Sequence, residues 1–106
     1  MFSYTVRCTI NKPETAESWL AWLTCAHIQD VLDAGATRAE IFEMETVAVE
    51  ARTFEIRYRF DSVESFLEYE RSHAPRLRAE GLEKFPLEMG LEYTRSTGKS
   101  LHKFNC

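Results

Sequence analysis

Residues 2–10 alternate strictly between apolar and polar side chains. The apolar members are Phe2, Tyr4, Val6, Cys8 and Ile10. A period of two with aromatic and β-branched residues predicts a β-strand that buries one face. The same alternation returns over residues 52–60 and 87–95, with the apolar members Phe54, Ile56, Tyr58, Phe60, Leu87, Met89, Leu91 and Tyr93. These segments predict three strands that share a buried face.

Residues 14–34 follow a helical period instead. At about 100° per residue, most of their apolar side chains fall within one continuous arc. This arc contains Trp19, Leu20, Leu23, Ala26, His27 and Val31. Ile28 and Leu32 lie outside it, which indicates that a second surface of the helix is covered, for example by a partner chain. Gly35 is well placed to end the helix.

A further strand is predicted before residue 50, although its alternation is poor. The segment runs from residue 36 to about residue 47, and its apolar residues fall on two faces. One face carries Ala39 and Ile41, and the other carries Phe42 and Met44. Such a change of phase indicates either a bulge or a strand with apolar residues on both faces.

The remaining turns and helices follow from capping residues and proline. A hairpin turn is expected near Glu50, although no Asn-Gly or Pro-Gly pair marks it. A helix is predicted over residues 62–72, and a second helical segment starts at Pro75, because proline breaks the first. Gly81 and Pro86 close this region.

The order of elements is therefore strand, helix, strand, strand, helix, strand. This order predicts an α+β, ferredoxin-like βαββαβ fold, in which a four-stranded antiparallel sheet carries both helices on one face. We expect one domain over residues 1–106, with a core of about residues 2–95 and a C-terminal tail over 96–106. The polar sheet face either meets solvent or stacks on a second copy, and we expect the second arrangement, a homodimer with an eight-stranded barrel.

Composition and charge narrow the classes of partner. The 106 residues are 44% hydrophobic and carry a net charge of −4. Every acidic residue lies at or before Glu92, so the body of the chain is acidic and would repel a nucleic acid. No apolar stretch reaches the ~20 residues of a membrane span, and the N-terminus lacks the pattern of a signal peptide. We therefore expect neither nucleic-acid nor membrane binding.

The spacing of the cysteines and the lack of standard cofactor motifs limit which metals and cofactors the sequence predicts. Cys8, Cys25 and Cys106 cannot all pair within one chain, and they lack the spacing of a zinc site. This predicts free thiols in a reducing cytoplasm and no bound metal. The sequence has no GxGxxG, P-loop, HExxH or GxSxG motif, so we expect no cofactor.

His27 is the candidate catalytic residue. It lies on the predicted core-facing arc, where a neutral imidazole lining an apolar pocket could act as a general base. The alternative is a core or interface histidine that is hydrogen-bonded to a carbonyl or carboxylate group. An open cavity beside an unpartnered His27 would favour the first role.

Two other residue types are candidates for ligand binding. Trp22 could stack on a flat ligand, although a tryptophan on an amphipathic helix also serves plain packing. Arg57 and Arg59 could clamp a carboxylate or phosphate group on the sheet face. Pairing with Glu55 or Glu92 across strands is the alternative for both arginines.

Several short segments resemble one family. They are Tyr4-x-Val6, Glu17-Ser18-Trp19-Leu20-x-Trp22-Leu23, His27-Ile28-x-x-Val31-Leu32-x-x-Gly35, Phe54-x-Ile56-x-Tyr58, Phe66-Leu67-x-Tyr69 and Ala74-Pro75-Arg76-Leu77-Arg78-Ala79-Glu80-Gly81. The chain thereby resembles the bacterial domain-of-unknown-function family 4286. The resemblance implies the dimeric α+β barrel superfamily, which includes cofactor-free monooxygenases, haem-degrading enzymes, isomerases and a sugar mutarotase. Several of these proteins have a pocket between sheet and helices, and some use a histidine of the first helix.

Three hypotheses about function follow. The first is a cytoplasmic homodimer that binds a small ligand in a helix–sheet pocket. The second is a cofactor-free enzyme, of monooxygenase, isomerase or mutarotase type, in which His27 is the base and Trp22, Tyr58 or Arg57 shapes the pocket. The third is a protein-interaction module that docks through exposed Ile28, Leu32 and the basic tail.

Overall fold

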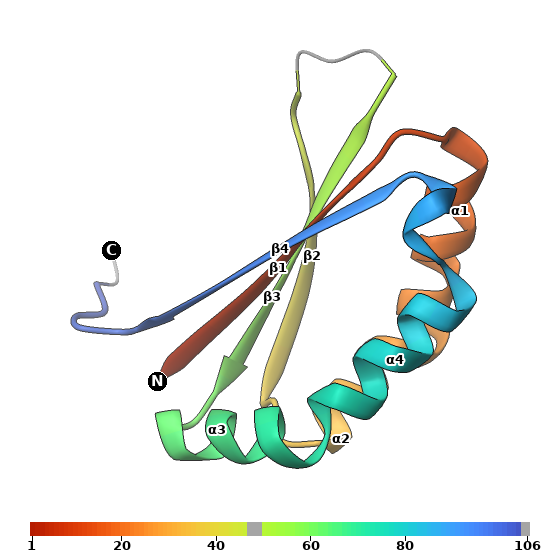
Figure 1. The fold of residues 1–106 in the computed structure, drawn as a ribbon. Helices are drawn as coiled ribbons and strands as arrows, with labels where there is room; N and C mark the ends of the chain where they lie inside the picture. Colours follow the sequence, from red (N-terminus) through yellow and green to blue (C-terminus); the bar gives the residue numbers. More distant parts are fainter. Residues whose placement is uncertain (47–49, 105–106) are drawn as a thin grey trace.

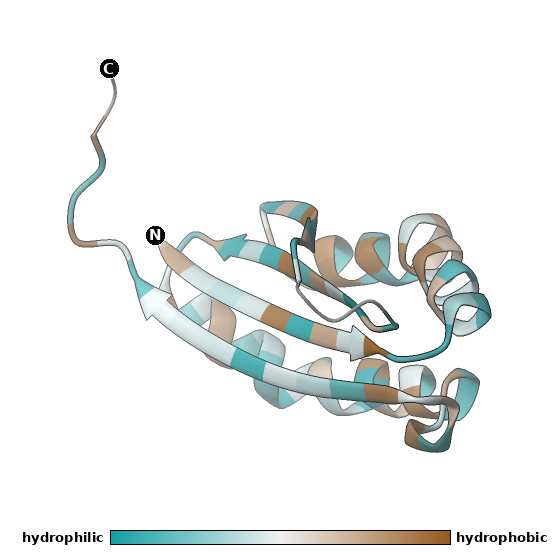
Figure 2. Ribbon diagram, turned by 90° about the horizontal axis from the view of Figure 1, so that it is seen from above, coloured by the Kyte–Doolittle hydropathy of each residue, from teal (hydrophilic) through white to brown (hydrophobic). Residues whose placement is uncertain are grey.

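Four strands form one antiparallel sheet in the order β2-β3-β1-β4, and the helices cover one of its faces (Figures 1 and 2). The computed structural model describes residues 1–46 and 50–104. The elements are β1 (Phe2–Ile10), α1 (Pro13–Trp22), the π-helical turn η1 (Leu23–His27), α2 (Ile28–Asp33), β2 (Arg38–Met44), β3 (Arg52–Phe60), α3 (Val63–Ser72), α4 (Ala74–Lys84), the 3₁₀ turn η2 (Leu87–Met89) and β4 (Leu91–Lys99). The predicted ferredoxin-like plan is confirmed.

The strand register places the predicted apolar residues on the face that meets the helices. Tyr4 lies opposite Tyr58, Val6 opposite Ile56, and Cys8 opposite Phe54. The buried core consists of these strand residues together with side chains from the helices. Its largest fully buried members are Trp19, Tyr58, Phe54, Phe60, Ile10, Leu23, Ile56, Leu77, Val31 and Cys8. Alternation alone was therefore a correct guide to the core face of β1 and β3.

The last strand begins four residues later than the alternation predicts. Leu87 and Met89 lie in the turn η2, so their assignment to a strand is wrong. Gly90 ends that turn with φ +94°, where a Cβ would lie 2.0 Å from the Asn11 side-chain oxygen. The strand then continues to Lys99 as a neighbour of β1, beyond the residue 95 expected from the apolar pattern.

β2 is shorter than predicted, and its pairing settles the ambiguity in its alternation. The register with β3 runs without a break from Arg38 to Met44, so the strand has no bulge there. Ala39 and Ile41 face the helices, whereas Phe42 and Met44 lie half-buried on the outer face. The expected turn near Glu50 includes residues 47–49, which lie outside the described residues, as does Cys106.

The first helix contains a π-helical turn that the sequence pattern did not reveal. The amide of Ile28 donates to the carbonyl of Leu23, five residues earlier. The hydroxyl of Thr24 donates to the carbonyls of Leu20 (3.0 Å) and Ala21 (3.2 Å). Such i→i+5 turns are rare and are frequent at functional sites.

This turn changes which residues of the helix are buried. Ala26 is exposed, so its predicted place on the buried arc is wrong, while Ile28 and Leu32 pack half-buried against the core. At about 100° per residue, Ile28 and Leu32 would lie roughly 180° and 220° from Trp19 in a continuous α-helix. Skipping one residue brings them to about 80° and 120°, which is why they contact the core. A partner chain is not needed to explain them.

The second helical region is divided as predicted. Ser62 caps α3 through a reciprocal pair of hydrogen bonds with Ser65, and Pro75 lies in the first turn of α4. Val63 and Leu67 of α3 are 42% and 54% exposed. None of the helices within the described residues is long and apolar enough to cross a membrane.

Candidate functional site

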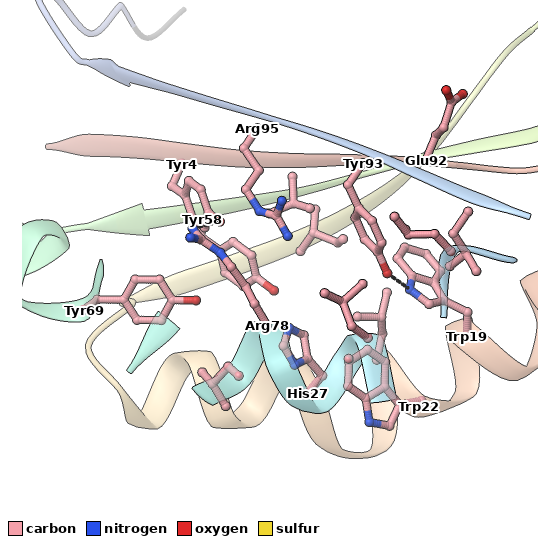
Figure 3. A pocket seen from close by; sticks show the side chains of 18 residues that line it. Tyr4, Trp19, Trp22, His27, Tyr58, Tyr69, Arg78, Glu92, Tyr93 and Arg95 are labelled. Carbon is pink, nitrogen blue, oxygen red and sulfur yellow. Dashed lines mark hydrogen bonds between the residues drawn. The ribbon is translucent and has the colours of Figure 1, made fainter. Parts of the chain in front are cut away.

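A cavity of about 420 Å³ lies between the sheet and the helices, and aromatic side chains form much of its lining (Figure 3). The residues labelled at the cavity are Tyr4, Trp19, Trp22, His27, Tyr58, Tyr69, Arg78, Glu92, Tyr93 and Arg95. The strands β1, β3 and β4 supply the floor, because alternate residues of each strand point toward the helices. The first helix forms one wall, and α3 with α4 forms the other.

Gly81 allows the two walls to approach each other. A Cβ at this position of α4 would lie 3.2 Å from the ring of Trp22, which is closer than carbon atoms normally pack. The Trp22 ring also contacts Phe85, with ring centroids 5.6 Å apart. The absence of a side chain at Gly81 therefore sets the position of Trp22 at the cavity wall.

His27 lies in the cavity wall, stacked on Trp22. The two ring centroids are 4.5 Å apart and the rings are inclined by 25°. Residues five apart are separated by about 140° in a continuous α-helix, so the stack depends on the π-turn η1. Nδ1 of His27 is buried and has no hydrogen-bond partner. Burial lowers the pKa of His27, the charge of Arg95 lowers it further, and Asp30 opposes both effects.

Arg78 crosses the cavity from α4. One Nη atom donates to the hydroxyl of Tyr4 (3.0 Å) and to a carboxylate oxygen of Glu70. Its Nε atom is buried and has no partner. Burial alone would lower the pKa of Arg78, but the contacts with Tyr4 and Glu70 outweigh it and hold the pKa above the usual value. The guanidinium group is therefore charged and held in one orientation, with an unused donor.

Three tyrosine hydroxyl groups around the cavity remain protonated. Burial raises the pKa of Tyr58 and raises the pKa values of Tyr69 and Tyr93 to about 12. The Tyr93 hydroxyl accepts a hydrogen bond from Nε1 of Trp19 (3.1 Å). The cavity thus combines aromatic faces, hydroxyl donors, two cations and a neutral imidazole.

The structure brings three of the five candidate site residues together, and it places Arg57 and Arg59 beside a smaller hollow on the other face of the sheet. His27, Trp22 and Tyr58 all line the cavity. Arg57 lies on the opposite face of the sheet, where it pairs with Glu55 (2.9 Å) and stands 4.0 Å above the ring of Phe42. The smaller hollow on that face measures about 170 Å³. Arg57 therefore does not shape the helix–sheet cavity.

Sequence reasoning missed Arg78 and Arg95. Arg95 follows Tyr93 by two residues, so it occupies the next helix-facing position of β4, opposite Val6. Arg78 follows the buried Leu77. For Arg95, the available signal was a charged residue at a position that the alternation over residues 87–95 assigns to the core face. Within the described residues there is no cluster of three metal-ligating side chains.

Comparisons with known proteins agree with this fold. A family model described as domain of unknown function (DUF4286) matches residues 1–95, which confirms the resemblance seen in the sequence. No curated protein matches the chain.

Solved structures with the same architecture share little sequence with this chain. A dimeric ferredoxin-like protein from an uncultured marine organism is 14% identical, with a TM-score of 0.73 and 100% of both chains covered. A second such protein, also from an uncultured marine organism, is 10% identical, with a TM-score of 0.64 and 97% of each chain covered. A monooxygenase of Streptomyces coelicolor, in complex with nanaomycin D, is 12% identical, with a TM-score of 0.60, 98% of this chain and 92% of that chain covered. At these identities the likeness shows the ferredoxin-like fold alone.

Proposed function

The chain belongs to the DUF4286 family, and we propose that it binds a small aromatic molecule in the cavity between its sheet and its helices. The observation that carries the proposal is the cavity of about 420 Å³ with its aromatic lining. Sites for small molecules usually measure about 300–1,000 Å³ and combine an apolar lining with a few polar groups. Stacking on Trp22 and the tyrosine rings would favour a flat ligand over an aliphatic one.

The nanaomycin D complex of the Streptomyces monooxygenase supports this proposal by analogy. That protein has the same fold and is bound to a small organic ligand. One fold can host many unrelated functions, which depend on the residues of each site. The geometry of the cavity in this chain therefore remains the main support.

A fluorescence titration with N-phenyl-1-naphthylamine, a neutral two-ring aromatic probe, tests the proposal. We expect saturable enhancement with the native protein and at least fivefold weaker binding to Trp22→Leu. Leu67→Ala, at an exposed position on α3, is the matched control and should bind normally. No saturable binding of this probe, or equal binding by Trp22→Leu, would refute the proposed site.

We also propose that two copies associate through the outer sheet face, as a homodimer in a reducing cytoplasm. Phe42 and Met44 leave apolar surface on this face. Arg38 lies directly opposite Arg59, and neither forms an ion pair with a carboxylate within the described residues. Like charges placed opposite each other are unfavourable in one sheet, so carboxylates of a second copy would stabilise them.

Light scattering with size-exclusion chromatography tests the dimer. We expect the mass of two chains for the parent protein and of one chain for Phe42→Asp. Leu67→Asp on α3 provides a charge-matched control that should remain dimeric. A parent mass of one chain at micromolar concentration would exclude the dimer.

A second candidate function is supported by His27. Its unpartnered Nδ1 and lowered pKa provide a neutral base in the cavity wall at pH 7. Such a base could remove an acidic proton from a bound ligand without a cofactor. If His27 is a catalytic base, His27→Gln should still bind the fluorescent probe but should no longer remove the proton from the ligand. The docking hypothesis has less support, because Ile28 and Leu32 pack against the protein's own core.

A further inference from the structure

The positive charge at the cavity exceeds the negative charge that faces it. Arg78 and Arg95 both line the cavity. Glu70 neutralises Arg78 by direct contact. Glu92 belongs to the outer side of β4 by its register opposite Thr9, and its carboxylate points away from the other labelled side chains in Figure 3. Arg95 has no ion pair with any carboxylate among the described residues.

The guanidinium group of Arg95 is placed to contact a ligand in the cavity. Figure 3 shows its guanidinium group directed from β4 toward the helices that carry Arg78 and His27. The guanidinium carbon is 5.3 Å from the centroid of the Tyr93 ring. Burial lowers the pKa of His27 and raises the pKa values of Tyr69 and Tyr93; the charge of Arg95 adds to the first effect and opposes the other two. These effects place the charge of Arg95 within electrostatic reach of both cavity walls.

Arg78 adds a second donor to the same region. Its contacts with Tyr4 and Glu70 fix the guanidinium plane, and the buried Nε remains without a partner. A buried donor without a partner is unfavourable until a ligand supplies an acceptor. Guanidinium groups present paired N–H donors that match the two oxygens of a carboxylate or sulfonate.

We infer that the ligand of this cavity carries an anionic oxygen group on its aromatic frame, and that Arg95 binds this group with assistance from Arg78. The inference rests on the proposed function and adds the charge of the ligand to it. The aromatic rings of the cavity bind the frame, and the two arginines select for the acidic substituent. A neutral aromatic molecule of the same shape binds more weakly, because it leaves the charge of Arg95 unpaired.

A matched pair of fluorescent probes tests this selection. 8-Anilinonaphthalene-1-sulfonate and N-phenyl-1-naphthylamine share one aromatic frame and differ by a sulfonate group. We expect the sulfonate to bind about tenfold more tightly to the parent protein, as a charge-assisted hydrogen bond predicts. In Arg95→Gln this preference should fall to about twofold or less, while the affinity for the neutral probe stays unchanged.

Arg71→Gln is the matched control, since it removes the same charge from the exposed surface of α3, where Arg71 pairs with Glu68. It should keep the preference for the sulfonate. Arg95→Lys, which keeps the charge but not the planar donor pair, should give an intermediate preference. Near-ultraviolet circular dichroism would verify that each variant is natively packed, because the sulfonate dye also binds loosely packed states.

The outcomes separate this inference from the proposed function. If both probes bind in a Trp22-dependent way but Arg95→Gln keeps the tenfold preference, the inference is wrong and the proposed pocket stands. An equal loss in Arg95→Gln and Arg71→Gln would indicate a general effect of net charge and would also overturn it. If N-phenyl-1-naphthylamine shows no saturable binding to the native protein, the proposed function itself fails.

Discussion

Deletion of one exposed residue from the π-turn should leave the protein folded and nearly as stable. The turn η1 holds one residue more than an α-helical turn, and this extra residue keeps the buried faces of α1 and α2 aligned. Ala26 is exposed within that turn. Its removal should convert residues 13–33 into one continuous α-helix without turning either buried face away from the core.

The expected size of the effect follows from the helix geometry. At about 100° per residue, Val31 lies roughly 120° from Trp19 in an unbroken helix of the present length, and roughly 20° after one residue is skipped. Turning Val31 out of the core would cost about 1.5–3 kcal/mol. The deletion of Ala26 preserves that burial, so we expect the free energy of unfolding to change by less than about 1 kcal/mol.

Deletion of Ala79 is the matched control. Ala79 is also an exposed alanine, but it lies in α4, a regular α-helix with no extra residue to absorb the change. Its removal turns Phe85, which is 7% exposed, by about 100° out of the core and should cost at least about 2 kcal/mol. Urea denaturation followed by circular dichroism measures both values. If the deletion of Ala26 costs as much as that of Ala79, the explanation of how Ile28 and Leu32 reach the core is wrong.

Three further predictions concern pH, backbone conformation and the cavity. Burial holds the pKa of His27 below the ordinary value of 6.5, so the imidazole of the unfolded chain is protonated at a higher pH than that of the folded protein. The parent protein should therefore lose more stability than His27→Gln as the pH falls below about 6.5. Parallel profiles of the free energy of unfolding in urea from pH 7 to pH 5 would contradict this. Gly90→Ala should cost about 1–3 kcal/mol because of its φ of +94°, whereas Gly98→Ala, with no atom within 4 Å of the added Cβ, should cost less than half of that in the same assay. Leu77→Ala removes a fully buried side chain beside the cavity and should lower the free energy of unfolding by about 2–5 kcal/mol in urea denaturation. Leu67→Ala, at an exposed position, should change it by no more than about 0.5 kcal/mol. A similar loss for both variants would show that Leu77 is not a core residue in solution.

The topology could be predicted because local pattern and global fold agree for most of the chain. The alternation in β1 and β3 selects one buried face, and the cap at Ser62 and the proline at Pro75 divide α3 from α4. Once the order of the elements is known, few arrangements of an antiparallel sheet with helices on one face remain. Agreement between levels of this kind is what makes a sequence specify a single fold.

Two of the failures arose where a regular pattern continued across a change in backbone geometry. A helical wheel assumes a constant angle per residue, so it placed Ala26 in the core and Ile28 outside it. The alternation of Leu87 and Met89 likewise continued into β4, although the chain first makes a 3₁₀ turn that ends at Gly90. Neither the extra residue of the π-turn nor the positive φ of Gly90 leaves a periodic signal in the sequence. Both depend on tertiary contacts that sequence patterns do not contain.

The cavity contains the residues that are least consistent with the amphipathic pattern of their helices and strands. His27 and Arg78 are half-buried on the core side of their elements, where an apolar side chain would stabilise the fold more, whereas Arg95 lines the cavity from an exposed position of β4. Trp19 and Tyr93 satisfy each other by a hydrogen bond, whereas Nδ1 of His27 and Nε of Arg78 are buried without partners. Departures of this kind persist in natural proteins where a function offsets their cost. A ligand that supplies an acceptor to the buried Nε of Arg78 would reduce that cost, and its anionic group would pair with the exposed Arg95, so it would stabilise the folded state as well as bind to it.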